Sequence, residues 1–175
     1  MTANLEAPVL VFHSGPRPAG VDERNARDRL RAGIEALLAK ADDTGTCPAM
    51  EFHPSMFVGT LADYRAIARD FPKLSLTLDV GHLRCTDERP LAEGILDAAG
   101  ETAHVHLEDI RGRVHKHLPV GEGDLPFGEV FGALRQSGFA GICAAEFHSR
   151  EIDREEAALA RDTFRRLAPL LHEER

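Results

Sequence analysis

Short apolar runs alternate with longer amphipathic segments along the whole chain. Residues 7–13 are almost continuously apolar, as expected of a strand that is buried on both faces. Residues 74–82 show a period of two instead, with leucines on one face and small polar residues, including Asp79, on the other. Between such runs, apolar residues recur at helical spacing with charges among them, as in residues 22–41.

This pattern predicts five pairs of strand and helix. The strands are residues 7–13, 49–53, 74–82, 103–108 and 141–148, and the helices are residues 22–41, 60–70, 88–99, 127–137 and a last one that Asp153 and Glu156 open as a capping box. Residues 109–126 form a long loop. The regular alternation implies right-handed βαβ units and a parallel sheet, either open or closed into a barrel. Because HSGP follows the first strand in place of a glycine-rich phosphate loop, a dinucleotide-binding sheet is disfavoured.

Composition and charge narrow the function classes. With 175 residues, 43% hydrophobic and 29% charged, the chain is expected to fold as one globular domain over residues 1–175. A net charge of −8 argues against nucleic acid as a partner, because phosphate binding depends largely on Lys and Arg. The sequence has no long apolar run and no signal-like N-terminus, so we expect a cytoplasmic protein without a membrane partner. Cys47, Cys85 and Cys143 are too scattered for a disulfide framework or a cysteine zinc site.

Each predicted strand ends near a side chain that can bind a metal ion. These side chains are His13, Glu51, Asp79 with His82 just beyond it, His106 and Glu146. In parallel α/β folds the carboxyl ends of the strands converge, so ligands from separate strands can meet around one ion. Taken singly, each residue has an ordinary structural alternative, such as a helix cap for Asp79 or an arginine partner for either glutamate. Their shared position at strand ends favours a common metal site.

The long loop adds two of the nine histidines in the chain. His115 and His117 are separated by one residue, so an extended segment would point both side chains the same way. Two nearby glycines, Gly121 and Gly123, allow the loop to turn over the strand ends. Imidazoles combined with carboxylates suit Zn, Mn, Fe or Co better than Ca or Mg. Four further histidines are interpreted as structural or surface residues: His53, His104, His148 and His172.

Taken in order, the motifs of the chain resemble those of the xylose isomerase-like TIM barrels. The matching segments are VFHSG (11–15), MEFHPS (50–55), LTLDVGHL (76–83), HVHLED (104–109), HKHLPVGEGDLPF (115–127) and GICAAEFHS (141–149). This superfamily includes sugar epimerases and isomerases, inosose dehydratases and apurinic/apyrimidinic endonucleases. Its members normally have eight βα units, and the segments here match the last five. The resemblance therefore implies an α/β fold that is an incomplete TIM-type (β/α)-barrel with about five parallel strands.

The isomerase and epimerase branch of this superfamily holds its metal on four successive strand ends, and the matching residues here are Glu51, Asp79, His106 and Glu146. The resemblance also assigns catalytic roles to Glu51 and Glu146 as acid and base, and to His82 as a substrate contact. It implies an enzyme that uses Mn or Zn: a metal-dependent isomerase, epimerase or related lyase acting on a small carbohydrate, either a sugar, a sugar phosphate or a cyclitol. The metal would polarise a carbonyl while the glutamates move the neighbouring proton.

Two alternatives remain open at this point. The endonuclease branch hydrolyses phosphoesters at a multi-zinc cluster, and its additional ligands for a second ion resemble His13, His82, His115 and His117, although it usually has Asp at the position of His115. The other alternative is a non-catalytic truncated barrel that acts as a binding subunit. An unclosed parallel sheet exposes two strand edges and its interior face. We therefore expect a homo-oligomer or a complementing chain to cover the open sheet.

Overall fold

The chain folds into a curved parallel sheet with helices along its outer side. The computed structural model describes residues 7–147 and 154–171. The strands are β1 (Val9–His13), β2 (Cys47–Glu51), β3 (Ser75–Asp79), β4 (Thr102–Leu107), β5 (Asp109–Arg111), β6 (Val114–Leu118) and β7 (Ile142–Ala145). The helices are α1 (Glu23–Thr44), α2 (Leu61–Ala68), α3 (Val80–Thr86), α4 (Leu91–Ala98), the short 3-10 helix η2 (Ala99–Glu101), α5 (Phe127–Gln136) and α6 (Arg154–Leu171).

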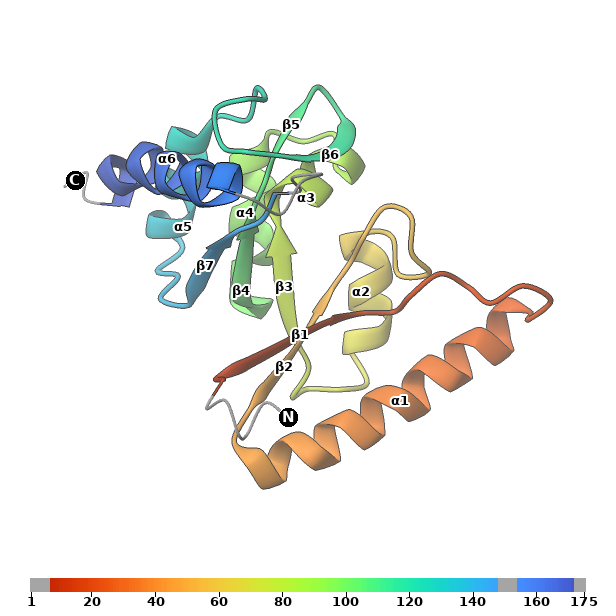
Figure 1. Ribbon diagram of the computed structural model, residues 1–175. Coiled ribbons are helices and arrows are strands. Elements are labelled where there is room, and N and C mark those ends of the chain that lie inside the picture. The colour runs from red at the N-terminus through yellow and green to blue at the C-terminus, as the bar shows by residue number, and fades with distance from the viewer. Residues whose placement is uncertain (1–6, 148–153, 172–175) are drawn as a thin grey trace.

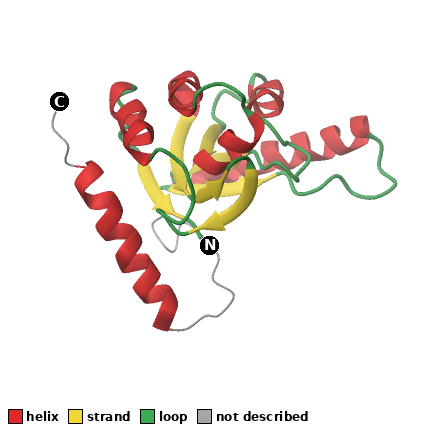
Figure 2. Ribbon diagram, turned by 90° about the horizontal axis from the view of Figure 1, so that it is seen from above, coloured by secondary structure: helices red, strands yellow, loops and turns green. Residues whose placement is uncertain are grey.

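Parallel pairing aligns the carboxyl ends of the strands. Five strands pair in the order β1-β2-β3-β4-β7, and β5 and β6 form a separate antiparallel hairpin. His13 pairs with Glu51 across β1 and β2, and Asp79 pairs with His106 across β3 and β4. The hairpin lies beyond the upper ends of β3 and β4 in Figure 1, and the view from above shows the strands curving inside the helices (Figure 2). The arrangement is half of a TIM-type barrel, which confirms the predicted incomplete (β/α)-barrel.

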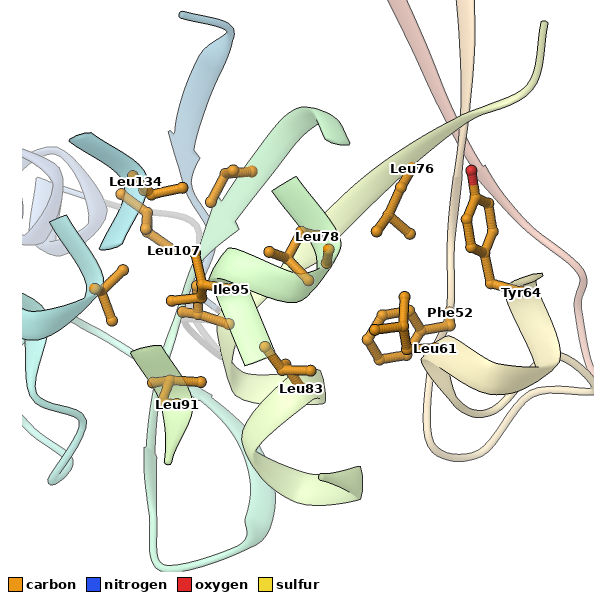
Figure 3. Close-up of a cluster of buried hydrophobic side chains, with 14 of the residues drawn as sticks. Phe52, Leu61, Tyr64, Leu76, Leu78, Leu83, Leu91, Ile95, Leu107 and Leu134 are labelled. Atoms are coloured by element: carbon orange, nitrogen blue, oxygen red, sulfur yellow. The ribbon is translucent and has the colours of Figure 1, made fainter. Parts of the chain in front are cut away.

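Alternation along β3 separates the core from the site. Leu76 and Leu78 are fully buried and belong to the same cluster as Leu83 of α3 and Ile95 of α4 (Figure 3). Each leucine removed from water in this way contributes about 1.5–3 kcal/mol to folding. Asp79 has the opposite side-chain direction, because successive residues of a strand point to opposite faces. The same alternation that builds the core therefore places the carboxylate of Asp79 on the face of the sheet opposite to the leucines.

Several predicted bounds differ from the structure, and two of these differences affect the candidate site. The strand predicted over 74–82 ends at Asp79, because Oδ1 of Asp79 accepts the backbone N–H of His82 at 2.7 Å and so caps α3. Residues 109–126, predicted as a loop, contain the β5-β6 hairpin, whose turn uses Gly112 in the left-handed conformation. Of the predicted capping box, Asp153 lies outside the described residues.

The described sheet ends in two strands that each pair on one side only. β1 pairs only with β2, and β7 pairs only with β4, within the described residues. Ile142 on β7 is 47% exposed, which is unusual for a large apolar side chain in a parallel sheet. Both edges are consequently open to pairing with another strand. Among the helices in the described ranges, none is long and apolar enough to cross a membrane.

Candidate metal centre

Three carboxylates and one imidazole from four neighbouring strands meet at the carboxyl ends of the sheet. Glu51, Asp79, His106 and Glu146 each offer a ligand atom, and these atoms lie within 4.8 Å of one another. Nδ1 of His106 is 3.2 Å from Oε1 of Glu51 and 2.7 Å from Oε2 of Glu146. Glu51 and Asp79 are the last residues of their strands, and Glu146 follows β7 directly. We call this group the carboxylate centre.

Mutual contact sets the charges of the carboxylate centre. Burial alone would raise the pKa of Glu51, which is 3% exposed, but hydrogen bonds from His106 and His82 outweigh burial and hold that pKa well below its ordinary value. His106 lies between two carboxylates, and despite burial the contacts with Glu146 and Glu51 raise its pKa to about 10. The hydrogen bond with His106 lowers the pKa of Glu146. Without metal, a protonated His106 therefore holds two ionised glutamates together, and a cation would replace that proton.

Asp79 is the part of the carboxylate centre that most clearly suits a cation. Its side chain is fully buried, and Oδ2 has no hydrogen-bond partner within the described residues. Burial, and then the nearby charge of Glu108, raises the pKa of Asp79 well above its ordinary value. An unsatisfied buried polar atom costs about 1–3 kcal/mol, a cost that a bound divalent ion would remove. Three carboxylates with one imidazole are a donor set that fits Mn or Zn.

A second group of side chains, here called the imidazole pocket, consists of His53, His82, His115 and His117. One ring nitrogen of each lies within 4.8 Å of the others. Nε2 of His82 is 3.0 Å from Nε2 of His115, and the ring centres of His115 and His117 are 4.5 Å apart. Burial and the neighbouring imidazoles of His82 and His115 lower the pKa of His53 to about 4, and burial also lowers the pKa of His115. These two rings are therefore neutral at neutral pH.

A buried carboxylate adjoins the imidazole pocket. Glu108 follows β4 and is fully buried, with its oxygens 2.8 Å from Nδ1 of His117, 3.6 Å from Nε2 of His115 and 3.8 Å from Nε2 of His82. Burial opposes ionisation, but the contact with His117 lowers the pKa of Glu108 below its ordinary value. A Cβ at position 81 would overlap the Glu108 carboxylate, so Gly81 is required for this close approach.

Asp109 organises the loop behind the imidazole pocket. Oδ2 of Asp109 accepts the backbone N–H groups of Gly121 at 2.8 Å and Gly123 at 2.9 Å, and Oδ1 accepts that of Leu125 at 3.1 Å. A Cβ at position 123 would overlap the Asp109 carboxylate, which explains the glycine there. Asp109 also pairs with Leu118 at the base of the hairpin. One buried carboxylate thus ties the loop to the hairpin that carries two histidines of the pocket.

The structure distributes the predicted site residues over two groups. The four strand-end residues of the predicted metal site form the carboxylate centre, and three of the predicted second-ion residues, His82, His115 and His117, lie in the imidazole pocket. The fourth, His13, is exposed, with its ring centre 6.2 Å from that of His53, and belongs to neither group.

The sequence pattern does not identify His53, a member of the pocket, or Glu108, the carboxylate that adjoins it. The pattern indicates a structural role for His53, although this residue lies two positions beyond Glu51 and therefore continues the same face of the strand. Glu108 likewise lies two positions beyond His106, so the same spacing could have indicated it. His104 is buried beside His106, with ring centres 5.0 Å apart, whereas His148 and His172 lie outside the described residues.

Comparison with known proteins identifies the family. The sequence model of the family described as xylose isomerase-like TIM barrel matches residues 1–170. The chain belongs to this family. Among the curated relatives of this xylose isomerase-like chain, L-ribulose-5-phosphate 3-epimerase UlaE from Escherichia coli O1:K1 / APEC is 31% identical over 143 residues, which cover 78% of this chain and 49% of the relative. The chain thus spans about half the length of the curated relatives it matches.

Solved structures share the fold of this family member. A D-tagatose 3-epimerase-like protein superposes with a TM-score of 0.77 and 23% identity, covering 98% of this chain and 66% of its own. The structure described as IOLI protein with a binding zinc atom has a TM-score of 0.76 and 19% identity, covering 97% of this chain and 65% of its own. At these identities the similarity shows the fold.

Replacing Asp109 by Ala is expected to lower the free energy of unfolding by about 3 kcal/mol. The backbone donors of Gly121, Gly123 and Leu125 lose their acceptor, at about 1 kcal/mol each. Urea denaturation measures the change. The matched control is Asp124→Ala, which removes an exposed carboxylate that accepts the N–H of Gly112; its effect should stay below about 1 kcal/mol. Equal losses in the two variants would contradict the role assigned to Asp109.

The metal-free chain is expected to lose stability as pH rises from 6.5 toward about 10. In this interval folded His106 keeps its proton while the unfolded chain releases it, so the stabilisation present at low pH disappears. On the acid side, the pKa of His53 is lowered to about 4, so stability also falls as pH drops below 6.5. Urea denaturation in the presence of a chelator, at pH 6.5 and near pH 10, measures the alkaline loss.

The control for this pH dependence is His106→Asn, which cannot titrate and should flatten the alkaline loss. Saturation with Mn²⁺ should flatten it as well, because the cation takes the place of the proton. An unchanged alkaline slope in His106→Asn would show that another group is responsible.

Proposed function

We propose that this chain is a divalent-metal-dependent sugar isomerase or epimerase. The observation that carries the proposal is the convergence of Glu51, Asp79, His106 and Glu146, from four adjacent strands, within 4.8 Å. A relative named L-ribulose-5-phosphate 3-epimerase and a solved structure described as a D-tagatose 3-epimerase-like protein support a carbohydrate substrate, whether a sugar, a sugar phosphate or a cyclitol. A related lyase reaction would use the same proton transfer.

The carboxylate centre is proposed to hold Mn or Zn. Its three carboxylates favour Mn, and the zinc atom of the IOLI structure supports Zn as the alternative. When bound, the ion would act as a Lewis acid that polarises a carbonyl or hydroxyl oxygen of the substrate. Asp79 and His106 are ligands, with Asp79 fixed in place by the helix cap that it provides.

Glu51 and Glu146 are the proposed acid and base. Both have lowered pKa values and are therefore ionised at neutral pH, so either can accept a proton from the carbon beside a carbonyl. Epimerisation requires removal of a proton from one face of that carbon and its return to the other, which two carboxylates facing one imidazole can accomplish. His82, with Nδ1 3.3 Å from Oε1 of Glu51, is proposed to contact the substrate.

The imidazole pocket favours a second candidate, phosphoester hydrolysis at a multi-zinc cluster. This activity would use His82, His115 and His117 together with the carboxylate centre, and the sequence prediction adds His13. The net charge of −8 speaks against DNA as its substrate. Two or three bound zinc ions per chain together with nicking of abasic DNA would favour this candidate over the epimerase.

Residues 1–175 are further proposed to form a single domain that corresponds to the last five of the family's eight βα units. The support is the open sheet with unpaired edges at β1 and β7, together with solved relatives of which the chain covers 66%. A second copy or a complementing chain would cover these edges. In the alternative form of this proposal, the chain itself is a non-catalytic binding subunit and its partner carries the activity.

The Glu146→Gln variant is expected to lower turnover at least about 10²-fold and to leave the fold intact, because the amide keeps the size of the side chain but cannot accept the proton. Exchange of substrate C–H for solvent deuterium, followed by NMR on a panel of ketoses and their phosphates with Mn²⁺ present, measures this step. Glu129→Gln, an exposed substitution on α5, is the control. Undiminished exchange in Glu146→Gln would remove the acid/base role.

In solution, the purified chain is expected to form a complex heavier than the 19.2 kDa of one chain. The added mass would come from a second copy or from a co-purified partner. Light scattering after size exclusion gives the mass. Replacing exposed Ile142 on edge strand β7 by Lys should shift the mass downward, because a charge on an edge strand opposes pairing. A stable monomer of the unaltered protein would contradict the proposal that another chain covers the edges of the sheet.

A further inference from the structure

We propose that two copies of this chain associate through Phe164 of α6, which inserts into an apolar groove beside α1 of the other copy. The contact occurs twice in the dimer and brings the β7 edge of each copy to the β1 edge of the other. This inference rests on the proposal that another chain covers the sheet edges. It commits to a second copy as that chain and identifies the contact.

The groove lies between β1 and α1 and has a volume of about 470 Å³. Leu10 and Phe12 line its β1 side, and Leu30, Gly33 and Leu37 line its α1 side. The four large side chains among these residues are only half-buried. A contiguous group of exposed apolar side chains beside an open strand edge is typical of a surface that another protein segment covers.

The residues of α1 that line the groove are spaced as in helices that pack side by side. Ala26, Leu30, Gly33 and Leu37 follow one another at intervals of four, three and four residues, which is the spacing of a coiled-coil seam. A Cβ added at Gly33 would meet no atom within 4 Å, so the seam has an open hole at this position. A large side chain from a neighbouring helix fits such a hole.

Phe164 on α6 is the matching projection. Its side chain is 67% exposed, although α6 is anchored to the core through buried Leu167. The residues four positions before and after it are Ala160 and Ala168, which share its face of the helix. Phe164 therefore stands out between two small side chains, as a side chain that enters a hole on another helix must.

The handedness of the fold brings α6 of one copy to the groove of the other. In a right-handed βαβ unit the helix crosses the outer side of the sheet from its own strand toward the next one, as α1 does between β1 and β2. α6 follows β7, whose outer edge is unpaired within the described residues. When β1 of a second copy pairs there in parallel, α6 covers the new strand pair and lies beside α1 of that copy. Within one chain the two helices lie at opposite ends of the molecule (Figure 1).

A twofold axis parallel to the strands generates both contacts at once, so the dimer is closed. A stable interface buries about 1,200–2,000 Å² in total, and each contact has to supply half of that area. A buried phenylalanine contributes about 150–250 Å², and the groove that receives it loses a similar area. The paired strand edges, including 47% exposed Ile142, supply the remainder. Because all strands of the dimer are parallel, each half-barrel faces the concave side that carries the carboxylate centre of the other.

The test uses two variants that each remove one half of the contact. Gly33→Glu places a charge in the groove, and Phe164→Ser removes the projection. Each variant loses both contacts of its own dimer, so sedimentation equilibrium should show a dimer weakened about 10³-fold, from about 30-fold for each contact. Far-UV circular dichroism should stay native, because an added Cβ at Gly33 meets no atom and Phe164 is exposed.

Each variant has a matched control. Gly128→Glu on α5 changes another helical glycine whose added Cβ would meet no atom within 4 Å, and it adds the same charge. Val114→Ser on β6 removes another large apolar side chain, which is 60% exposed. Both controls should keep the dimer of the unaltered protein.

Mixing Gly33→Glu with Phe164→Ser is the decisive measurement. A dimer with one copy of each keeps one intact contact, because Phe164 of the first variant enters the unaltered groove of the second. Native mass spectrometry should therefore show a mixed dimer about 30-fold stronger than the dimer of either variant alone.

No gain on mixing would overturn the contact, as would an unweakened dimer of Phe164→Ser. A complex of one copy with a different protein would overturn the choice of a second copy and would leave the proposal of covered edges standing. A monomeric unaltered protein would contradict both. Absence of sugar turnover would contradict the proposed function and would leave these association constants unaffected.

Discussion

Parallel pairing is the constraint on which the rest of this structure depends. Because β2, β3, β4 and β7 run in the same direction and are in register, the polar residues that end them are forced into one small volume. Glu51 and Asp79 are buried there with Glu146 close by, and the repulsion between such carboxylates in a region of low dielectric has to be offset. His106 offsets part of it as a proton carrier, and a divalent cation would offset more. The hydrophobic cluster on the other face supplies the stability that makes this accumulation of charge tolerable.

The end of β4 serves three purposes within four residues. His106 faces the carboxylate centre, Glu108 lies against the imidazole pocket, and Asp109 ties the following loop to the hairpin. Alternation explains the first two, since residues two apart in extended backbone lie on one face. Asp109 lies on the other face, where backbone N–H groups of the loop need an acceptor. This short segment therefore connects the sheet to the β5-β6 hairpin and to the loop that follows the hairpin.

The family relationship gives this arrangement its context. A full barrel has no sheet edges, whereas β1 and β7 each have one unpaired edge within the described residues. The carboxylate centre nevertheless lies on the four neighbouring strands β2, β3, β4 and β7. From β1, exposed His13 lies nearby and is not a member of the group. The carboxylate centre can therefore assemble on five strands, while enclosure of a substrate depends on what covers the open side.

The sequence by itself determined the succession of parallel strands and helices, the leucine face of β3 and the strand-end positions from which the candidate metal ligands come. These follow from local patterns: side-chain period, alternation of strands with helices, and the position of a residue at the end of an apolar run. The choice of Glu51, Asp79, His106 and Glu146 among six strand-end residues came from the resemblance to the family. Asp79 illustrates the limit: the sequence offers a helix cap or a place at the metal site as alternatives for it, and in the structure one carboxylate caps α3 and lies in the carboxylate centre.

Only the tertiary structure decided the membership of the imidazole pocket. His82 and His115 are 33 residues apart, and their contact depends on how the hairpin folds back over the sheet. The proton positions on His82 and His53 are set by backbone groups, the carbonyl of Phe52 and the N–H of Ser55, whose orientation no side-chain pattern records. Long-range geometry, rather than residue type, thus decides which histidines share the pocket and where His82 and His53 carry their protons.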